Sequence, residues 1–378
     1  MSTGPHHPQP AANLLEVTLS EVTLSEVTDS LAALGFELRR SWPRAHDHLL
    51  LDLRATGPRE GTTVAGQWFG DPERARAVAA ATPGARYVGR VVLQPDGADQ
   101  KLPGLALLLR EPGTTLVSHR PGRRAVLRQV RGPGAVAPGR ADESEPVRYA
   151  KVVPLKKHRG LEASARGAAS LPLRTPRVLA VDPARGTVTT AALPGVPLHH
   201  LLAGPRAVAS CTAAGAALAE VHRIPPLVDL PRHTWSDEQA VTRRWEHLAA
   251  RFGVGSPPMP GSEDPAEAEP GARPGETALI HRDFHDLQVL VAEDDSVGVL
   301  DFDLMALGDP SLDLANLLAH LDLRCRQGVV ADAGPLREAV LAGYAPSPRV
   351  LSRVAGYEAL ARRRLAAVYG FRPTDHVT

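Results

Sequence analysis

Two aspartates and a glutamine between residues 279 and 303 have the types and spacing that phosphoryl transfer requires. Gln288 follows Asp283 by five residues, and Asp301 follows Gln288 by thirteen. A carboxylate can orient a hydroxyl group and accept its proton, while an amide and a second carboxylate can hold Mg²⁺ on the phosphates of a nucleotide. The pattern therefore predicts Asp283 as the catalytic base, and Gln288 and Asp301 as magnesium ligands.

A purely structural interpretation is open for the first two of these residues and is disfavoured for the third. Asp283 could be a turn residue after a strand that ends at Ile280, a common position for aspartate. Gln288 stands where asparagine would be expected, and its longer side chain could instead pack at the mouth of a hairpin. Asp301 lies in an apolar segment, where an unpaired carboxylate would be costly to bury, which favours metal binding.

The neighbouring polar residues are expected to support this site. If the strand continues, Asp303 faces the same side as Asp301, so it could share the metal or bond to the backbone. Asp309 is predicted to be a turn or cap residue before a helix. Asp313 is predicted to anchor the backbone of residues 281–283. We expect His281 to pack beneath the metal site and not to act as the base.

The loop between the two motif strands also carries His285 and Asp286. Both lie close in sequence to the expected base. They are therefore our nearest candidates for contact with the phosphoryl acceptor.

The nucleotide phosphates need positive charge, and Lys151 is the best candidate to supply it. Only 4 lysines accompany 39 arginines in the chain, so a lysine among apolar strand residues suggests a specific role. Its compact ammonium group suits the α- and β-phosphates, and a nearby carboxylate would hold it in place. Glu162 is the only glutamate between Lys151 and Glu220, so it is the expected partner. Alternatively, Lys151 is a surface residue on a strand edge.

A glycine-rich phosphate loop is missing from the sequence. In its place, a short turn at Pro121-Gly122 is flanked by Arg120, Arg123 and Arg124. These arginines could reach phosphates, or they could form an exposed basic turn.

The elements that must position these residues are a β-rich segment followed by a mainly helical one. The arginine turn joins two strands, Lys151 lies on a third, and two more follow the short helix that carries Glu162. Beyond Pro194-Gly195 the pattern becomes helical, with the metal-ligand hairpin inside it. The predicted strands are Thr114–Ser118, Arg124–Val130, Val147–Val153, Arg177–Val181 and Thr187–Leu193, and the main predicted helices are Ala207–Val221 and 350–369.

Two further segments precede the β-rich one. Residues 1–30 are predicted to be a disordered, low-complexity tail, because a repeat of period five matches neither a helix nor a strand face. Residues 31–112 are predicted to be a small accessory α+β unit without a catalytic constellation. Its strands are expected at Leu49–Leu53, Thr62–Phe69 and Tyr87–Leu93, with a helix at Pro72–Ala81.

Composition indicates an ordinary globular protein. Hydrophobic residues make up 43% of the chain and charged residues 22%, and two cysteines are too few for a disulfide scaffold. Since no segment resembles a signal peptide or a membrane span, we expect a cytoplasmic location and no membrane partner. The arginines are dispersed and do not form a stripe, so no nucleic-acid partner is expected.

Charge is unevenly spread although the net charge is +1. Residues 233–333 carry 7 basic and 19 acidic side chains. An acidic surface there could attract a cationic substrate. Alternatively, the motif carboxylates and a solvated acidic loop within residues 254–277 account for the excess.

Together these motifs resemble the aminoglycoside-phosphotransferase-like family of small-molecule kinases, which have a protein-kinase-like bilobal fold. The resemblance rests on His281-Arg282-Asp283 with Gln288, on Leu300–Asp303 and on Gly308–Leu314. It implies an α+β fold with a β-rich N-lobe and a mainly helical C-lobe. With the boundaries expected here, the N-lobe spans residues 113–193 and the C-lobe residues 194–372, and the unit ahead of them resembles the cap of maltokinase-type relatives.

The resemblance further implies ATP and Mg²⁺ as cofactors, with Ala191–Leu193 contacting adenine through the backbone. The implied reaction is transfer of the γ-phosphate to a hydroxyl of a small molecule such as an aminoglycoside, a sugar or a related metabolite. Two alternatives stay open at this point. One is a kinase of peptide or protein Ser/Thr, and the other is a nucleotide-binding pseudokinase, which Gln288 and the missing glycine loop would suit.

Overall fold

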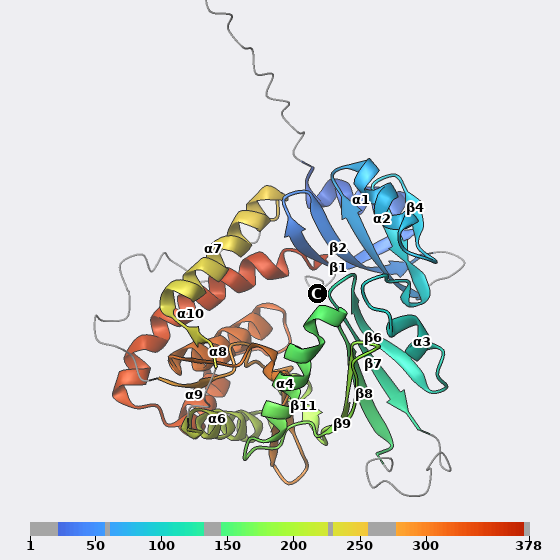
Figure 1. The fold of residues 1–378 in the computed structure, drawn as a ribbon. Helices are drawn as coiled ribbons and strands as arrows, with labels where there is room; N and C mark the ends of the chain where they lie inside the picture. The colour runs from blue at the N-terminus through green and yellow to red at the C-terminus, as the bar shows by residue number, and fades with distance from the viewer. Residues whose placement is uncertain (1–21, 57–60, 132–144, 226–229, 256–276, 374–378) are drawn as a thin grey trace, which may run out of the picture.

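Three parts follow one another along the chain: an N-terminal unit built on a five-stranded sheet, a second five-stranded sheet, and a mainly helical part (Figure 1). The computed structural model describes residues 22–56, 61–131, 145–225, 230–255 and 277–373. The first 21 residues of the predicted tail, the connection at 132–144 and the loop at 256–276 lie outside the described residues.

The N-terminal unit (residues 22–112) is an antiparallel sheet with three helices. The strand order is β1-β2-β3-β5-β4, so β1 and β4 are its edges. Its elements are α1 (Leu24–Ala33), β1 (Phe36–Ala45), β2 (His48–Ala55), β3 (Thr63–Phe69), α2 (Pro72–Ala80), β4 (Arg86–Val88), β5 (Val91–Gln94) and α3 (Leu105–Leu109).

Two expectations for this unit were wrong. The tail does not extend to residue 30, because α1 begins at Leu24 with a capping box formed by Thr23 and Glu26. This helix buries Val27 and Leu31, so tertiary packing overrides the five-residue repeat. The single strand expected at residues 87–93 is a hairpin of β4 and β5, since Gly89 turns the chain at a φ of +58°.

The second sheet has the five strands that the sequence predicted. They are β6 (Thr114–Arg120), β7 (Arg124–Val130), β8 (Val147–Val152), β9 (Val178–Asp182) and β10 (Thr187–Ala191), in the order β6-β7-β8-β10-β9. Helix α4 (His158–Ala169) connects β8 to β9. Lys151 lies in the centre of this sheet, between Val126 of β7 and Val188 of β10, so it is not on a strand edge.

The helical part consists of six helices and six short strands among the described residues. The helices are α5 (Leu198–Leu201), α6 (Ala207–Arg223), α7 (Trp235–Arg251), α8 (Ser311–Arg326), α9 (Gly334–Tyr344) and α10 (Pro348–Tyr369). The strands are β11 (Val196–Pro197), β12 (Arg232–His233), β13 (Ala278–Ile280), β14 (Val289–Val291), β15 (Val297–Val299) and β16 (Ala306–Gly308), paired as β11-β14-β15 and β12-β16-β13.

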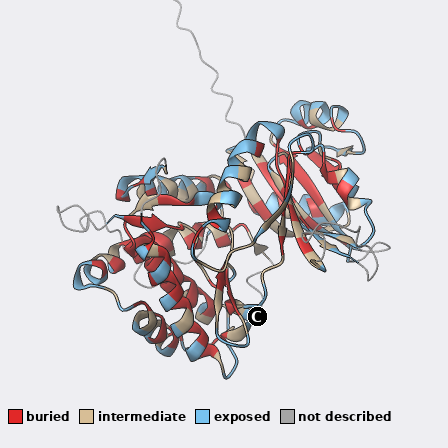
Figure 2. Ribbon diagram, turned by 60° about the horizontal axis from the view of Figure 1, so that its bottom comes forward, coloured by how far each residue is buried: buried red, intermediate tan, exposed pale blue. Residues whose placement is uncertain are grey.

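The buried residues form separate apolar cores (Figure 2). The largest apolar core joins the helices to the short motif strands, and Phe284, Val289 and Leu314 are among its fully buried members. A second core joins parts that are distant in sequence, since the N-terminal sheet and α1 pack on the C-terminal ends of α7 and α10. The α+β, two-lobed fold with an extra N-terminal unit is therefore confirmed. Within the described chain, no helix has both the length and the apolar character to cross a bilayer.

Candidate phosphoryl-transfer site

The 281–288 loop connects β13 to β14 and carries two of the three predicted site residues. Asp283 lies within it, with 39% of its side chain exposed. Gln288 precedes β14, and Asp301 follows β15, its antiparallel partner. The Leu300 backbone N–H donates to the Gln288 carbonyl at 2.8 Å, which closes this end of the hairpin. Gln288 and Asp301 therefore lie side by side, as the two strand ends predicted.

A left-handed residue turns the chain away from β15 immediately after the hairpin. Asp301 has a φ of +60° and precedes a short 3₁₀ turn, Phe302–Leu304. Asp303 is thus on a turn and not on a continued strand, yet its carboxylate still approaches that of Asp301. Lys151 Nζ donates to Asp301 Oδ1 at 2.9 Å and to Asp303 Oδ2 at 2.7 Å. A non-glycine residue in this conformation is strained, which is typical of functional positions.

The expected ion pair between Lys151 and Glu162 was wrong. Glu162 lies on α4 and accepts a hydrogen bond from Arg166 Nε at 2.9 Å, one helical turn away. Asp301 and Asp303 take its place as the partners of Lys151. A local i,i+4 arginine satisfies Glu162, so sequence position alone could not identify the carboxylate that holds the lysine.

Arg124, at the end of the basic turn, joins the same charge cluster. Its Nη1 lies 3.6 Å from Asp301 Oδ2 and 3.7 Å from Asp303 Oδ2. The sequence identified Arg124 only as one of several turn arginines. Two cations and two carboxylates therefore face one another beside the end of the hairpin that carries Asp301.

The two carboxylates of this cluster differ in their affinity for protons. Burial opposes ionisation of Asp301, but Lys151 and Arg124 outweigh it and hold the pKa of Asp301 below its usual value. Burial raises the pKa of Asp303, and the charge of Asp301 adds to that rise. Of the two, Asp301 is therefore the more acidic carboxylate.

A cavity of about 550 Å³ lies between the second sheet and the β14–β15 hairpin. Its polar end is formed by Lys151, Gln288, Asp301 and Asp303, and the segment expected to contact adenine, Ala191–Leu193, lines it as well. Val126 and Val188 contribute apolar walls. No hydrogen bond to the Gln288 side-chain amide is formed by the residues that the structure describes, so its oxygen can serve another ligand.

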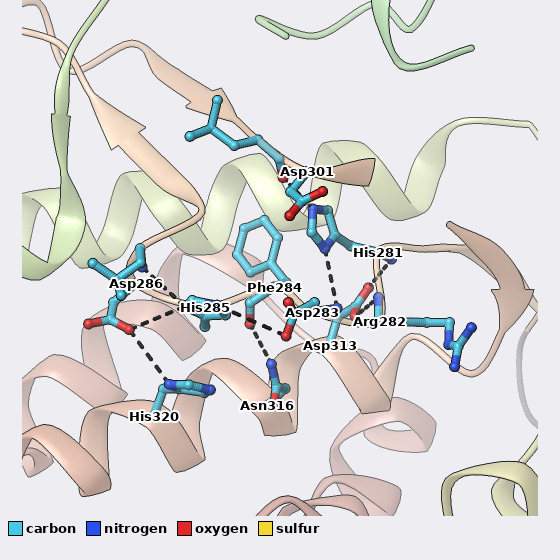
Figure 3. Close-up of polar contacts among 12 residues, drawn as sticks. His281, Arg282, Asp283, Phe284, His285, Asp286, Asp301, Asp313, Asn316 and His320 are labelled. Atoms are coloured by element: carbon cyan, nitrogen blue, oxygen red, sulfur yellow. Dashed lines mark hydrogen bonds and ion pairs between the residues drawn. The ribbon is translucent and has the colours of Figure 1, made fainter. Parts of the chain in front are cut away.

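Helix α8 supports the 281–288 loop through polar side chains on one face (Figure 3). Asp313 accepts hydrogen bonds from the backbone N–H groups of His281 and Arg282 at 2.6 and 2.7 Å. The anchoring role predicted for Asp313 is therefore confirmed. Arg282 needs this support, because its φ of +69° is unfavourable for a residue other than glycine.

The same face of α8 continues along the loop. Asn316 donates to the Phe284 carbonyl at 2.9 Å, and Arg324 makes two bonds with Asp286, at 2.7 and 3.1 Å. Together with Asp313 and His320, these residues recur at intervals of three or four, which aligns them on one side of the helix. Sequence reasoning missed this stripe, although four polar residues at helical spacing within the apolar α8 were a usable signal.

Asp286 is buried and cannot contact an acceptor, contrary to expectation. Its carboxylate is fully buried and also accepts from His199 Nδ1 at 2.7 Å. Burial opposes ionisation, but hydrogen bonds from His199, His285 and Arg324 outweigh it and hold the pKa of Asp286 well below its usual range. Because Arg324 already neutralises this carboxylate, we assign the group a structural role.

The two histidines of the loop have different surroundings. His281 is buried and its Nε2 bonds to the Leu300 carbonyl at 2.7 Å, so it lies beneath the hairpin as predicted and is not the base. His285 Nδ1 lies 3.2 Å from the Leu287 backbone nitrogen and 3.5 Å from Asp286 Oδ1. Its Nε2 lies 4.0 Å from Asp283 Oδ1, so His285 is the loop side chain that faces the predicted base.

Several acidic side chains in the described residues of the helical part pair with arginines. Asp309 also accepts from the Ser311 N–H at 2.9 Å, which confirms its turn role before α8. These pairs neutralise part of the acidic excess of residues 233–333. The pairs are Asp309–Arg353, Asp322–Arg337, Glu358–Arg362, Glu246–Arg363 and Glu238–Arg364.

The partners of Glu162 predict a small effect of its replacement. Because Glu162 pairs with Arg166 at the surface, Glu162→Gln should change nucleotide affinity by about twofold or less. Lys151→Met, as the comparison, should weaken nucleotide binding by at least about tenfold. Titration of each variant with a fluorescent ATP analogue checks both numbers. A large loss of affinity in Glu162→Gln would restore the Lys151–Glu162 pair as a feature of the nucleotide-bound state.

Several solved structures are similar to this chain. Aminoglycoside phosphotransferase APH(3'')-Id from Streptomyces rimosus is 22% identical, with 68% of this chain and 94% of that chain covered and a TM-score of 0.46. The same enzyme in complex with ADP and streptomycin is 22% identical, with 64% and 90% covered and a TM-score of 0.43. A choline/ethanolamine kinase family protein from Mesorhizobium loti is 18% identical, with 70% and 81% covered and a TM-score of 0.45. A search of curated protein sequences found no significant match.

The profile of a known family matches more than half of the chain. Residues 110–357 match the phosphotransferase enzyme family, and this range contains the second sheet, the 281–288 loop and the charge cluster around Lys151. The match starts just before β6, so most of the N-terminal unit lies outside it. The match and the site geometry agree with the resemblance noted in the sequence. The chain therefore belongs to the phosphotransferase enzyme family.

Proposed function

We propose that this protein is an ATP-dependent O-phosphotransferase that transfers the γ-phosphate to a hydroxyl of a small molecule, such as an aminoglycoside, a sugar or a related metabolite. One observation carries the proposal. Lys151, Gln288, Asp301 and Asp303 converge on one end of a 550 Å³ cavity whose other walls are mainly apolar. Such a cavity suits a nucleotide, with its base against the apolar walls and its phosphates at the charged end.

The residues at the charged end fit Mg²⁺. This ion prefers hard oxygen ligands and takes few of them from protein. Asp301 is firmly ionised, and the Gln288 amide oxygen lies at the same end of the hairpin. We therefore assign Asp301 and Gln288 as magnesium ligands, with Asp303 beside them. Bound there, Mg²⁺ would neutralise charge on the phosphates being transferred.

The remaining roles follow from the positions of the side chains. Lys151 and Arg124 are paired with Asp301 and Asp303. With Mg²⁺ on the carboxylates, both cations would be available to the phosphates of ATP. Asp283, exposed beside this site, would orient the acceptor hydroxyl and accept its proton. The two free cysteines, buried Cys211 and partly buried Cys325, suit the cytoplasmic location that we also propose.

Magnesium-dependent nucleotide binding is the first test. We expect Mg·ATP to raise the melting temperature of the wild-type protein, and Asp301→Asn to remove the magnesium-dependent part of that rise. Asp294→Asn is the matched control, because Asp294 is exposed in the turn of the same hairpin and bonds only to Ser296. Absence of any magnesium-dependent stabilisation in the wild-type protein would contradict the enzyme proposal and favour a pseudokinase.

The acceptor is tested separately. Transfer of labelled γ-phosphate from ATP should be screened against aminoglycosides, neutral sugars and hydroxylated peptides. Transfer to an aminoglycoside or a sugar supports the small-molecule proposal. Transfer to the peptides alone would replace it with a peptide kinase.

A further inference from the structure

The N-terminal unit is fixed to the helical part of the protein. The Leu24 N–H donates to the Phe252 carbonyl and the Ser41 N–H to the Phe371 carbonyl, both at 2.8 Å. Phe252 and Phe371 are completely buried in one apolar cluster with Leu31 of α1. Figure 1 shows this sheet against the ends of α7 and α10. The unit is therefore anchored on the C-lobe by buried apolar contact, which is not easily broken.

The same unit also holds the basic turn of the N-lobe. Asp99, in the segment after β5, accepts from the Gly122 N–H at 2.6 Å, and its carboxylate lies 3.0 Å from His119 Nε2. The Asp99 and His119 side chains are only 3% and 2% exposed. On the other side of the turn, the Arg120 guanidinium lies 4.7 Å above the ring of Trp42, a residue of β1.

The conformation of the Arg120–Arg124 turn depends on its contacts with the N-terminal unit. Gly122 has a φ of +65°, a conformation that favours glycine, and a Cβ at this position would lie 3.3 Å from Lys101 of the N-terminal unit. A backbone N–H that donates to a buried carboxylate forms one of the stronger hydrogen bonds in proteins. Two residues after Gly122, Arg124 enters the charge cluster at Asp301 and Asp303.

A continuous set of contacts thus runs from the C-lobe through the N-terminal unit to the phosphate end of the cavity. Apart from Gly122, the turn has no glycine, so it is not a glycine-rich loop that can fold over the phosphates of a nucleotide by itself. Its conformation is instead set from outside, by Asp99 on one side and Trp42 on the other.

We propose that the N-terminal unit joins the two lobes and holds the Arg120–Arg124 turn over the nucleotide phosphates, with Asp99 as the positioning residue. The proposal rests on the proposed function, because it assigns the turn to phosphate binding. Asp99 does not touch the nucleotide. It acts through Gly122, and so through the position of Arg124.

Asp99→Asn is the main test, since it removes the charge and keeps the size. We expect the dissociation constant and the KM for Mg·ATP to rise about tenfold, while kcat stays within about threefold, because the chemistry at Asp283 is untouched. A residue of merely structural importance would lower active protein and kcat without changing affinity. The matched control is Asp96→Asn, because Asp96 is exposed in the same segment and its φ of +52° suits asparagine.

Two further measurements keep the test decisive. Trp42→Leu removes only the ring under Arg120 and should raise the same dissociation constant about threefold. It substitutes for Asp99→Asn if that variant does not fold. Hydrogen exchange of the peptide that contains residues 119–124, measured without nucleotide, should be faster in Asp99→Asn than in Asp96→Asn.

The possible outcomes separate the two proposals. If the wild-type protein binds no nucleotide, the proposed function fails, and the exchange measurement still decides whether Asp99 holds the turn. If the wild-type protein binds Mg·ATP but Asp99→Asn and Trp42→Leu bind it equally well, our inference about the N-terminal unit is wrong. Equal exchange in Asp99→Asn and Asp96→Asn would also contradict it.

Discussion

Asp283→Asn should lower phosphate transfer about a thousandfold, the range over which a positioned general base contributes. The amide can still orient a hydroxyl but cannot accept its proton at neutral pH. Nucleotide affinity should stay within about twofold, because Lys151, Gln288 and Asp301 are unchanged. The protein should remain folded, since the side chain of Asp283 is 39% exposed and faces His285 at 4.0 Å without a short hydrogen bond.

The comparison with Asp294→Asn makes this result interpretable. Asp294 is an exposed aspartate in the turn of the β14–β15 hairpin, which follows the loop that carries Asp283, so its amide variant reports on the substitution itself. Turnover is measured with saturating Mg·ATP and the acceptor found in the screen, and affinity with a fluorescent ATP analogue. If Asp283→Asn kept turnover near that of Asp294→Asn, another group would be the base.

Asp286→Asn should destabilise the fold by about 3 kcal/mol or more, the usual effect of breaking a buried ion pair. Arg324 is only 4% exposed and gives Asp286 two hydrogen bonds. Removing the negative charge leaves the guanidinium charge buried without compensation, and His199 of α5 loses its charged acceptor as well. Urea denaturation at neutral pH measures the change in the free energy of unfolding.

A double variant tests whether the ion pair itself is responsible. Replacing both partners by apolar residues of similar size, Asp286→Leu with Arg324→Met, should be less destabilising than Asp286→Asn alone. A loss of less than about 1 kcal/mol in Asp286→Asn would show that solvent reaches Arg324 and that the pair is not truly buried.

The pH dependence of the same variant has a definite sign. The folded protein holds the pKa of Asp286 well below the unfolded value of 3.8. The stability that Asp286 contributes is therefore fully present above pH 3.8 and is lost as the pH falls from there toward the folded pKa. The difference in unfolding free energy between wild type and Asp286→Asn should accordingly shrink in acid.

Those parts of the fold could be predicted from the sequence in which a short run of residues by itself indicates a helix or a strand. The five strands of the second sheet were found because each is a short apolar run between turn residues. Strand β1 was missed because it carries several charges and Pro43. Proline is tolerated on an edge strand, and β1 is an edge of its sheet. Its strand character therefore comes from pairing with β2, which local pattern does not reveal.

The candidate site divides in the same way. Asp283, Gln288 and Asp301 could be proposed from the sequence because phosphoryl transfer requires their types and spacing, and their roles stay predictions. The surroundings of Asp286 could not be found, because its partners His199 and Arg324 are 87 and 38 residues away in sequence. From the sequence alone, Asp286 looks like an exposed loop residue. For Lys151, the predicted strand was right and only the predicted partner, Glu162, was wrong.

Helix α8 also fixes the spacing of the contacts along the 281–288 loop. From Asp313 to Arg324 it extends for about 16 Å along its axis, and its polar side chains match successive points of the loop. An insertion or deletion of one residue inside that interval would rotate everything beyond it by about 100° and break the match. Over evolution, this stretch of α8 should therefore accept changes of residue type much more readily than changes of length. Figure 3 shows α8 below the loop and Asp301 above it. Residues on the Asp301 side of the loop can therefore vary without disturbing the contacts between the loop and α8.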